Sequence, residues 1–272
     1  MTSLSIVIVS YNARKHLEDC LNSIVSAPPA TPHEIVVVDN ASTDGSGNAV
    51  RDRWPGIRVV EQPANLGFAA GNNAGIRATT GTMILLLNND TIVPAGAIDA
   101  LVARLVARPD AAVAGPRLTD ERGRPELSFG RMISPLTELR QKITLASYRR
   151  GVASVTRRIE RDTQREHDVE WVSGACLLVR RADAEKVGLL DERYFLYTED
   201  VDFCAAIRAT GRRVFFTPAA HVVHLGGRSR ATAPAAMDIA YRKSHLAFYE
   251  KHHPGWIPLL RLYLRLKGQL PR

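Results

Sequence analysis

The chain places an acid directly after a strongly apolar run. Residues 83–87 are five apolar side chains in succession, and Asn88, Asn89 and Asp90 follow them. Carboxylate and amide oxygens suit Mg²⁺ or Mn²⁺ better than zinc, and a cation held here would neutralise the charge of a departing diphosphate. Because Asn-Asn-Asp is also good turn chemistry, the segment alone leaves a metal site and a plain turn open.

A second group of acids opens the segment 199–210, whose pattern predicts a helix. Glu199, Asp200 and Asp202 would be favoured at a helix N-terminus by the helix dipole, an explanation that needs no function. The aromatic and apolar residues 194–197 precede them and predict an apolar wall with Asp200 at its edge. A carboxylate in that position could remove a proton from an acceptor hydroxyl as a general base.

Asp39 directly follows a second expected strand, residues 34–38. A carboxylate is costly to bury without a partner, and this one could accept the imide N–H of a uracil or thymine ring. The alternative is that it caps the next helix, although Ser42 or Asp44 would already serve as the N-cap.

Two histidines, His221 and His224, lie three residues apart near the end of an expected strand. Side chains three apart on a strand point to opposite faces, so only one of them can face a site. His224 is nearer the following loop and is the better candidate to complete a metal site. A lone histidine can equally be a structural side chain.

The elements that must position these residues alternate between strand and helix. Apolar runs predict strands at 4–9, 34–38, 57–60 and 83–87, with helical patterns between them and a further helix starting at Pro94. This alternation predicts a parallel sheet with helices on both faces and right-handed crossovers. Ligands of such sheets lie just beyond the carboxyl ends of the strands, where the candidate residues fall.

A glycine-rich turn precedes the last of these strands. Asn65, Gly67 and Phe68 open a helix of small residues that contains Asn72. The spacing is not GxGxxG and no Walker lysine is present, so neither a dinucleotide fold nor a P-loop is supported. The glycines could let the backbone approach a diphosphate or sugar, or could simply form a tight turn.

The alternation breaks at Pro116. Residues 117–168 are rich in arginine, with apolar side chains at roughly helical spacing, and predict a basic surface helix, a mobile insert, or a segment facing a membrane or an acceptor. Regular patterns then return. They predict a strand at 171–179, the helix at 199–210 and two short strands, 214–216 and 221–224.

Composition is that of an ordinary globular protein, with 272 residues, 45% hydrophobic and 24% charged. The three cysteines show no metal-type spacing, which suits a reducing cytosol. We expect no signal peptide, because the start lacks a basic leader, and no membrane-spanning helix. The net charge of +8 favours an anionic partner. Nucleic acid is disfavoured because aromatic side chains do not interleave with the arginines.

Taken in order, these segments resemble the inverting glycosyltransferases of family 2, which have the GT-A fold: a Rossmann-like, mostly parallel sheet flanked by helices. The resemblance covers about residues 3–230, and within the family it is greatest to bacterial rhamnosyltransferases that build cell-surface polysaccharide. The matching motifs are 5–12, 38–45, 65–69, 87–91, 171–175, 198–202 and 221–224.

The resemblance implies a role for each motif. Asp200 would be the catalytic base, Asp90 and His224 would hold Mg²⁺ or Mn²⁺, and Asp39 would contact the pyrimidine. Asn88 replaces the first acid of the DxD motif, which should weaken the affinity for the metal. The nucleotide sugar would be bound by Ser10, Tyr11, Asn12, Asp39, Asn40, Ser42, Asn65, Gly67, Phe68, Asn72, Asn88, Asn89, Trp171, Gly174 and Glu199.

The resemblance also implies a reaction: transfer of L-rhamnose from dTDP-L-rhamnose to a hydroxyl of a glycan or lipid-linked acceptor, with inversion. A UDP-sugar donor (GlcNAc, Gal or Glc) and a non-catalytic relative that binds sugar nucleotides are the alternatives. Nothing in the chain identifies a pocket for the thymine methyl group. The protein would be cytoplasmic or peripheral on the cytoplasmic face of the inner membrane.

We expect a glycosyltransferase domain over 1–230 and a helical appendage over 231–272. The domain would comprise a nucleotide-binding half at 3–116, a basic helical insert at 117–168 and an acceptor half at 169–230. Apolar side chains cover a wide face of the tail, with Arg261 and Arg265 opposite. That pattern suits contact with a membrane, packing on the catalytic domain, or a homodimer.

Overall fold

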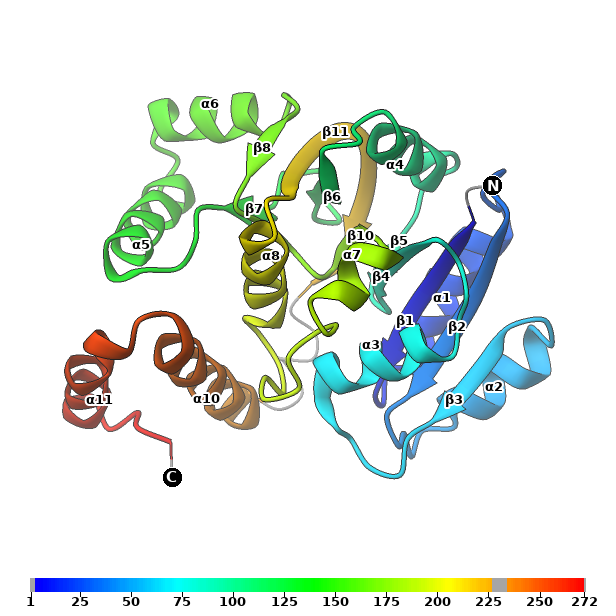
Figure 1. Ribbon diagram of the computed structural model, residues 1–272, viewed down its shortest axis with the longest axis horizontal. Coiled ribbons are helices and arrows are strands. Elements are labelled where there is room, and N and C mark those ends of the chain that lie inside the picture. The colour runs from blue at the N-terminus through cyan, green and yellow to red at the C-terminus, as the bar shows by residue number, and fades with distance from the viewer. Residues whose placement is uncertain (1–2, 227–233, 272) are drawn as a thin grey trace.

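The computed structural model describes residues 3–226 and 234–271, and its centre is a mixed α/β sheet (Figure 1). Among these residues the main sheet has nine strands, in the order β3-β2-β1-β4-β10-β6-β11-β5, with β8 paired to β11. The first four strands in sequence are parallel to one another: β1 (Leu4–Ser10), β2 (His33–Asp39), β3 (Arg58–Glu61) and β4 (Met83–Asn88).

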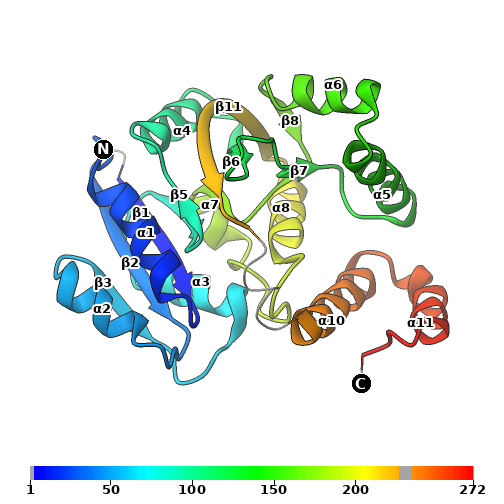
Figure 2. The ribbon, with the colours of Figure 1, turned by 180° about the vertical axis from the view of Figure 1, so that it is seen from behind.

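Helices cover both faces of this sheet because residues along each strand alternate between two cores. Ile6 and Ile8 of β1 face a cluster that contains apolar side chains of α1 and α4, whereas Val7 faces a cluster with α3 and α8. Figures 1 and 2 show α3 and α8 on one side and α1 on the other. The helices of this part are α1 (Arg14–Val25), α2 (Ser46–Arg53), α3 (Gly67–Arg77) and α4 (Ala97–Val106).

The second half adds antiparallel strands. β10 (Cys176–Arg180) is antiparallel to both β4 and β6 (Ala111–Thr119), and the short β5 (Thr91–Ile92) is antiparallel to β11 (Arg213–His224). The remaining elements of this half are β7 (Phe129–Gly130), β8 (His167–Val169), β9 (Trp171–Val172), α7 (Arg181–Lys186) and α8 (Glu199–Ala209). The sheet is therefore mostly parallel on one side and mixed on the other.

The expected strand at 171–179 is wrong as a single element. β9 pairs with β7 in a separate small sheet and β10 joins the main sheet, with Ser173 to Ala175 between them. The interruption has a local cause: Ser173 N–H donates to the Ser128 carbonyl and Gly174 N–H donates to Asp200, so neither serves the main ladder.

The two strands expected at 214–216 and 221–224 form one, β11. Its register against β6 shifts between Thr217 and His221, which bends the strand without ending it. The expected N-cap at Ser42 or Asp44 is also wrong, because α2 is preceded by Gly45 in a left-handed conformation (φ 79°) with no side-chain cap.

The insert and the tail are helical, and both lie away from the parallel strands (Figure 1). The insert contains α5 (Pro135–Arg149) and α6 (Ala153–Asp162), and the tail contains α10 (Pro234–His252), a 3₁₀ turn (Pro254–Trp256) and α11 (Ile257–Leu266). None of the described helices is long and apolar enough to cross a bilayer.

The tail packs on the segment around the start of α8. Phe248 and Tyr249 of α10 share a buried cluster with Tyr194 and Val201, which flank the start of α8. Asp202 is 2% exposed and accepts hydrogen bonds from Lys251 (2.8 Å) and His252 (2.6 Å). The sequence predicts that the tail contacts a membrane, packs on the catalytic domain or forms a homodimer. The structure shows that α10 packs on the rest of this chain.

Candidate functional site

The carboxyl ends of β1, β2 and β4 meet at one edge of the sheet. Asn40 N–H donates to the Ser10 carbonyl (2.9 Å), and the Asn89 amide donates to Ser10 Oγ (3.2 Å). Strands at this edge are parallel neighbours, so residues far apart in sequence arrive together. The edge brings together all three strand ends that the sequence marked as candidates.

Asp39 is held by the backbone around it. One oxygen accepts from Ser42 N–H (2.8 Å) and the other from Gly47 N–H (3.1 Å), and the residue is 7% exposed. A Cβ at Gly47 would lie 2.6 Å from that carboxylate, so only glycine fits there. Asp39 therefore anchors the turn before α2 and the start of that helix; contact with a base remains a prediction for its free lone pairs.

The loops after β1 and β2 are joined by hydrogen bonds. Asn12, at φ 49°, donates its N–H to Ser42 Oγ (3.0 Å) and accepts from Thr43 N–H (2.7 Å) through its side chain. Tyr11, beside these hydrogen bonds, is 49% exposed. Asn12 and Ser42 thus fix the rim of the edge, and the Tyr11 ring is free to stack on a ligand.

The turn before α3 joins this edge to the apolar wall before α8. Gly67 has φ +86°, and a Cβ there would collide with the carbonyl oxygen of Phe195, to which Phe68 N–H donates (2.7 Å). Three asparagine side chains hold the turn: Asn40 donates to the Gly67 carbonyl (2.9 Å), Asn72 to the Phe68 carbonyl (2.9 Å), and Asn65 accepts from Gly67 N–H (3.1 Å). Asn40 and Asn72 are buried, so these contacts position the turn.

Asp200 stands where that turn meets the break between β9 and β10. Its carboxylate accepts from Gly174 N–H and from Val201 N–H, both at 2.8 Å, and the side chain is half-buried. A Cβ at Gly174 would lie 3.2 Å from the Phe68 ring and 3.4 Å from Asp200 Cβ. Burial raises the pKa of Asp200, and the two backbone donors oppose this only in part. A raised pKa makes the carboxylate a stronger base.

Glu199, next to it, has a different environment. It is 5% exposed, and its Oε2 is buried with no hydrogen-bond partner among the described residues. Burial, and then the charge of Asp200, raises the pKa of Glu199 well above its usual range. The surroundings of these two neighbouring acids thus favour the neutral form more strongly at Glu199 than at Asp200.

Asp90 and His224 meet although 134 residues separate them. Antiparallel pairing of β11 with β5 and the hydrogen bond from Leu225 N–H to the Asp90 carbonyl (2.8 Å) bring the end of β11 to the end of β4. His224 Nε2 lies 3.3 Å from Asp90 Oδ1 and 3.4 Å from Asn88 Nδ2, and its Nδ1 lies 2.9 Å from Glu126 Oε2.

This acid–imidazole–acid row has a defined charge state. Burial lowers the pKa of His224, but the hydrogen bonds and charges of Asp90 and Glu126 raise it to about 10. Burial also raises the pKa of Asp90, but His224 brings it below the usual carboxyl value. The contacts with Asp90 and Glu126 therefore favour the protonated form of the His224 ring.

The same residues are chemically suited to a divalent ion, but only in part. Asp90 offers a carboxylate, Asn88 an amide oxygen and His224 its Nε2 once deprotonated, with Glu126 orienting the ring as carboxylates do beside metal-bound histidines. No group of three or more His, Cys, Asp and Glu side chains in the described part of the chain is arranged to hold a metal by itself. Oxygens of a bound diphosphate would have to supply the remaining ligands.

Two candidates lie outside this group. His221 bonds to Thr119 Oγ1 (2.7 Å) on the other face of β11, as its three-residue offset from His224 predicts. Trp171 lies in β9, where its indole N–H donates to the Arg131 carbonyl (2.8 Å) and its ring borders a cavity beside α5. Trp171 thus lines the cavity beside the insert.

Sequence reasoning missed Glu126. It sits in the arginine-rich segment after β6 and contacts His224 across 98 residues. The sequence offers only a weak indication of it: Glu126 is an acid in a predominantly basic stretch, and no local pattern predicts which side chain it contacts.

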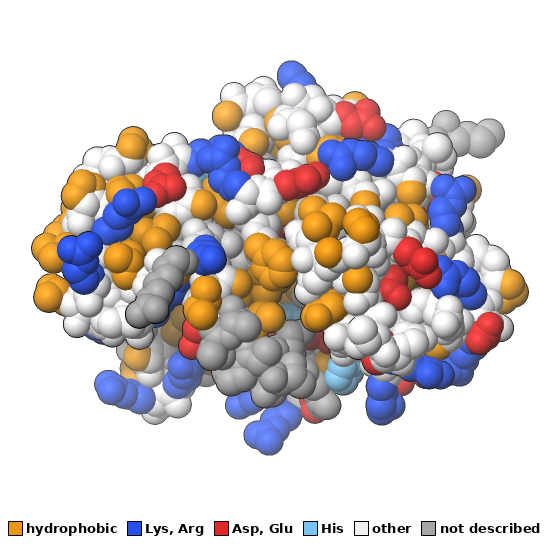
Figure 3. Space-filling view, turned by 90° about the horizontal axis from the view of Figure 1, so that it is seen from below, with side chains coloured by type: hydrophobic (Ala, Val, Ile, Leu, Met, Phe, Trp, Pro, Cys, Tyr) orange, Lys and Arg blue, Asp and Glu red, His pale blue; other side chains and the backbone are white. Residues whose placement is uncertain are grey.

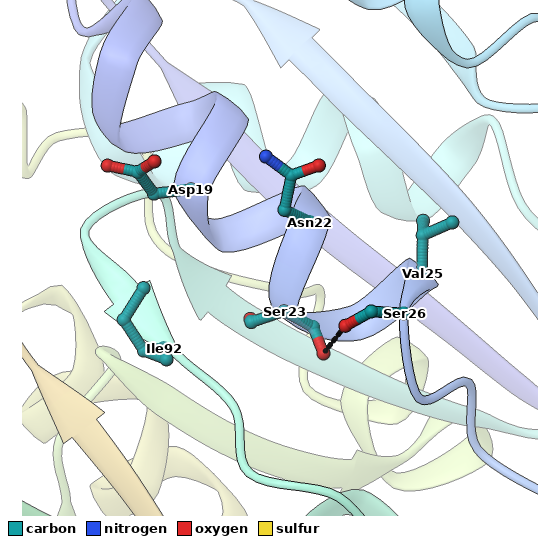
Figure 4. Close-up of a pocket in the computed structure, with 6 residues that line it drawn as sticks. All are labelled: Asp19, Asn22, Ser23, Val25, Ser26 and Ile92. Atoms are coloured by element: carbon teal, nitrogen blue, oxygen red, sulfur yellow. Dashed lines mark hydrogen bonds between the residues drawn. The ribbon is translucent and has the colours of Figure 1, made fainter.

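A shallow depression on α1 and β5 contains none of the candidate residues (Figure 4). It is lined by Asp19, Asn22, Ser23, Val25, Ser26 and Ile92.

Comparison with known proteins agrees with this geometry. Residues 5–188 match the family described as Glycosyl transferase family 2. A Mycobacterium tuberculosis protein named N-acetylglucosaminyl-diphospho-decaprenol L-rhamnosyltransferase is 33% identical over 265 residues, which cover 93% of this chain and 86% of the relative.

Solved structures share the fold. A mannosyltransferase from Pyrobaculum calidifontis, in complex with GDP-Man and Mn²⁺, aligns with a TM-score of 0.61 and 20% identity over 94% of this chain and 67% of its own. Residues 1–349 of S. aureus TarS align with a TM-score of 0.60 and 17% identity over 99% of this chain and 77% of that one.

Proposed function

Because the chain belongs to glycosyl transferase family 2, and is thus a glycosyltransferase, we propose that it transfers L-rhamnose from dTDP-L-rhamnose to a hydroxyl of a lipid-linked glycan, with inversion. The observation that carries the sugar and the acceptor is the 33% identity, over nearly the whole of both chains, to a rhamnosyltransferase whose name specifies a lipid-linked acceptor. The site supplies the groups that such a transfer needs.

Asp200 acts as the general base. Its oxygens are fixed by Gly174 N–H and Val201 N–H, so the carboxylate is held at the break between β9 and β10 and keeps lone pairs for a further hydrogen bond. It takes the proton of the acceptor hydroxyl as that oxygen attacks the anomeric carbon, while the bond to the diphosphate breaks on the opposite face. Neutral Glu199 keeps a second negative charge away from the approaching hydroxyl.

Asp90, Asn88 and His224 lie where the diphosphate leaves. A bound Mg²⁺ or Mn²⁺ would neutralise charge on the leaving diphosphate. The imidazole of His224, oriented by Glu126, lies within 3.4 Å of both Asp90 and Asn88, so these side chains bind as one unit. Preorganised charge of this kind contributes a large share of the rate in phosphate-leaving reactions.

The donor nucleotide would lie along the edge formed by β1 and β2. Tyr11 is free to stack on the base, and Asn12 and Ser42 hold the loops on either side. Asp39 would accept the imide N–H that uracil and thymine share. A UDP-sugar therefore fits the same groups, and it is the competing donor.

A donor screen tests the proposal. Purified protein with Mn²⁺ would be incubated with dTDP-L-rhamnose or with UDP-GlcNAc, UDP-Gal and UDP-Glc, and with a short-chain prenyl-diphosphate-linked GlcNAc as acceptor; products would be identified by mass spectrometry. We expect a deoxyhexose to be added from dTDP-L-rhamnose. Transfer from a UDP-sugar alone would replace the donor, and the absence of transfer from every donor would contradict the function.

A further inference from the structure

A second cavity lies between α5, α6 and the small sheet of β7 and β9. Asp200 contacts the chain just after β9, at Gly174. The cavity has a volume of about 570 Å³. It is lined by residues of the insert and by Trp171, and none of the expected donor-binding residues except Trp171 borders it. The residues that decide its chemistry are Arg131, Arg140, Arg158, Phe129, Ile143 and Trp171.

The polar side of the cavity is strongly cationic. Three arginines line it and no Asp or Glu does. Arg158 lies 3.6 Å from Asp162, whereas neither Arg131 nor Arg140 pairs with a carboxylate among the described residues. Guanidinium groups bind phosphate oxygens through paired hydrogen bonds, so two unpaired arginines in one cavity indicate an anionic phosphate ligand.

One face of α5 supplies this side. Thr137, Arg140, Gln141 and Thr144 are spaced i, i+3, i+4 and i+7, so they form a single stripe, and all four line the cavity. The helix start is fixed by a capping box of Ser134 and Thr137. Donors on a fixed helix face are preorganised for a ligand.

The other side is apolar. The Trp171 ring lies against Gly130, where a Cβ would come within 3.0 Å of the indole, and its N–H is used by the Arg131 carbonyl, so the ring presents an apolar face. Apolar cover continues out of the cavity, because Leu136, Leu139 and Ile143 of α5 are 72%, 56% and 59% exposed. α5 buries none of its side chains in this chain.

The cavity is joined to Asp200 by a short stretch of chain. Trp171, which lines the cavity, is three residues before Gly174, whose N–H binds Asp200, so the two Cα atoms lie at most about 10 Å apart. The cavity and Asp200 are thus neighbouring parts of the structure, as an acceptor with its hydroxyl at Asp200 and its diphosphate among the arginines requires.

We infer that this cavity binds the diphosphate and first isoprene units of a prenyl-diphosphate-linked acceptor. Arg131 and Arg140 bind the diphosphate, and Trp171, Ile143 and the exposed stripe of α5 cover the start of the chain. The inference rests on the proposed function, since it names the part of the acceptor that lies beyond the reacting sugar.

Binding of farnesyl diphosphate tests the inference without turnover. Titration calorimetry would compare farnesyl diphosphate, farnesol, pyrophosphate and dTDP on the full chain at fixed ionic strength. We expect farnesyl diphosphate to bind more tightly than farnesol or pyrophosphate and to bind equally well in the presence of saturating dTDP. Pyrophosphate binding as tight as that of farnesyl diphosphate, or displacement by dTDP, would overturn the inference.

Variants locate the binding. Arg131→Gln with Arg140→Gln should weaken farnesyl diphosphate at least about tenfold, because each lost contact is a charge-assisted hydrogen bond. Arg149→Gln with Arg150→Gln removes the same charge outside the cavity and is the matched control. Thr144→Glu, which adds an acid to the α5 stripe, should also weaken binding. Equal loss in the control, or unchanged affinity in both cavity variants, contradicts the assignment.

The outcome is separable from that of the donor screen. If arginine-dependent farnesyl diphosphate binding is found while no sugar is transferred from any donor, the cavity stands and the proposed function fails. If transfer occurs and farnesyl diphosphate binding does not depend on Arg131 and Arg140, the function stands and the inference fails.

Discussion

The edge where β1, β2 and β4 end and the insert around α5 differ in how they are built. At the edge and beside it, polar side chains are held by backbone groups: Asp39 and Asp200 each accept two hydrogen bonds from backbone N–H groups, and the Asn12 side chain accepts one from Thr43 N–H. Around α5, apolar and cationic side chains lie exposed, and the helix buries none. The first region is fixed before any ligand arrives, whereas the second offers surface for a ligand to cover.

The difference fits the two proposed substrates. A sugar nucleotide presents a base, ribose and diphosphate in one defined arrangement, which a rigid set of donors and acceptors can match. A lipid-linked glycan presents an anionic group and a flexible apolar chain. Figure 3 shows apolar side chains lying among lysines and arginines at the end of the molecule that carries α11. The comparison predicts that changes at the edge alter turnover and changes in the insert alter acceptor affinity.

The largest effect should come from Asp200→Asn. The amide keeps the shape but cannot accept the proton, and general base catalysis contributes about 10²–10⁴-fold, so kcat should fall by that factor. Binding of dTDP, measured by thermal shift, should stay within about twofold because the proposed contacts with the nucleotide lie at the ends of β1 and β2 and not at Asp200. Substantial turnover in the purified variant would mean that another group is the base.

Glu126→Gln should have the next largest effect. Glu126 contacts His224 Nδ1 and would act on the metal through that ring. Loss of such an outer carboxylate typically lowers metal affinity or activity about 10–100-fold. We expect a higher Mn²⁺ concentration for half-maximal rate, with most of kcat recovered at saturating Mn²⁺. A fall in kcat that excess Mn²⁺ does not restore would show that Glu126 has another role.

Lys251→Met tests how much the tail stabilises the start of α8, which carries Asp200. Lys251 donates to both Asp191 and Asp202 (2.8 Å each), and Asp202 is nearly fully buried at the start of α8. His252 still pairs with Asp202 in the variant, so the free energy of unfolding should fall by only about 1–2 kcal/mol. Chemical denaturation measures it, with Lys267→Met as an exposed control. A loss equal to that of the control would mean that the contacts of Lys251 do not stabilise the fold.

The sequence predicts the edge better than the insert, for a physical reason. Strand ends carry their polar residues locally, so the apolar runs before Asp39 and Asp90 are enough to place both. Glu126 meets His224 only through the pairing of β6 with β11, which no local pattern encodes. β6 itself escaped prediction because it is built of small residues with Gly115 and Pro116. A Cβ at Gly115 would lie 2.6 Å from Val172, so tertiary packing selects a weak strand former there.

The neighbouring acids at the start of α8 allow the sharpest test of the preformed edge, through the pH dependence of stability. The folded-state pKa of Glu199 is raised, because burial and the charge of Asp200 favour the neutral form. A carboxyl raised in this way stabilises the fold fully below its unfolded pKa, about 4.3, and that stabilisation is lost as pH rises towards the folded pKa. The loss is at most about 1.4 kcal/mol per pH unit for a single group.

Glu199→Gln cannot ionise, so the variant should lack this slope. We expect the free energy of unfolding of the variant to match that of the natural protein near pH 4 and to exceed it increasingly from pH 5 to pH 8. Urea denaturation at each pH measures it, with Glu185→Gln as a matched control on the exposed surface of α7. A variant that parallels the natural protein across this range would place an ionised Glu199 beside Asp200, and the division of the two acids into a neutral and a reactive one would fail.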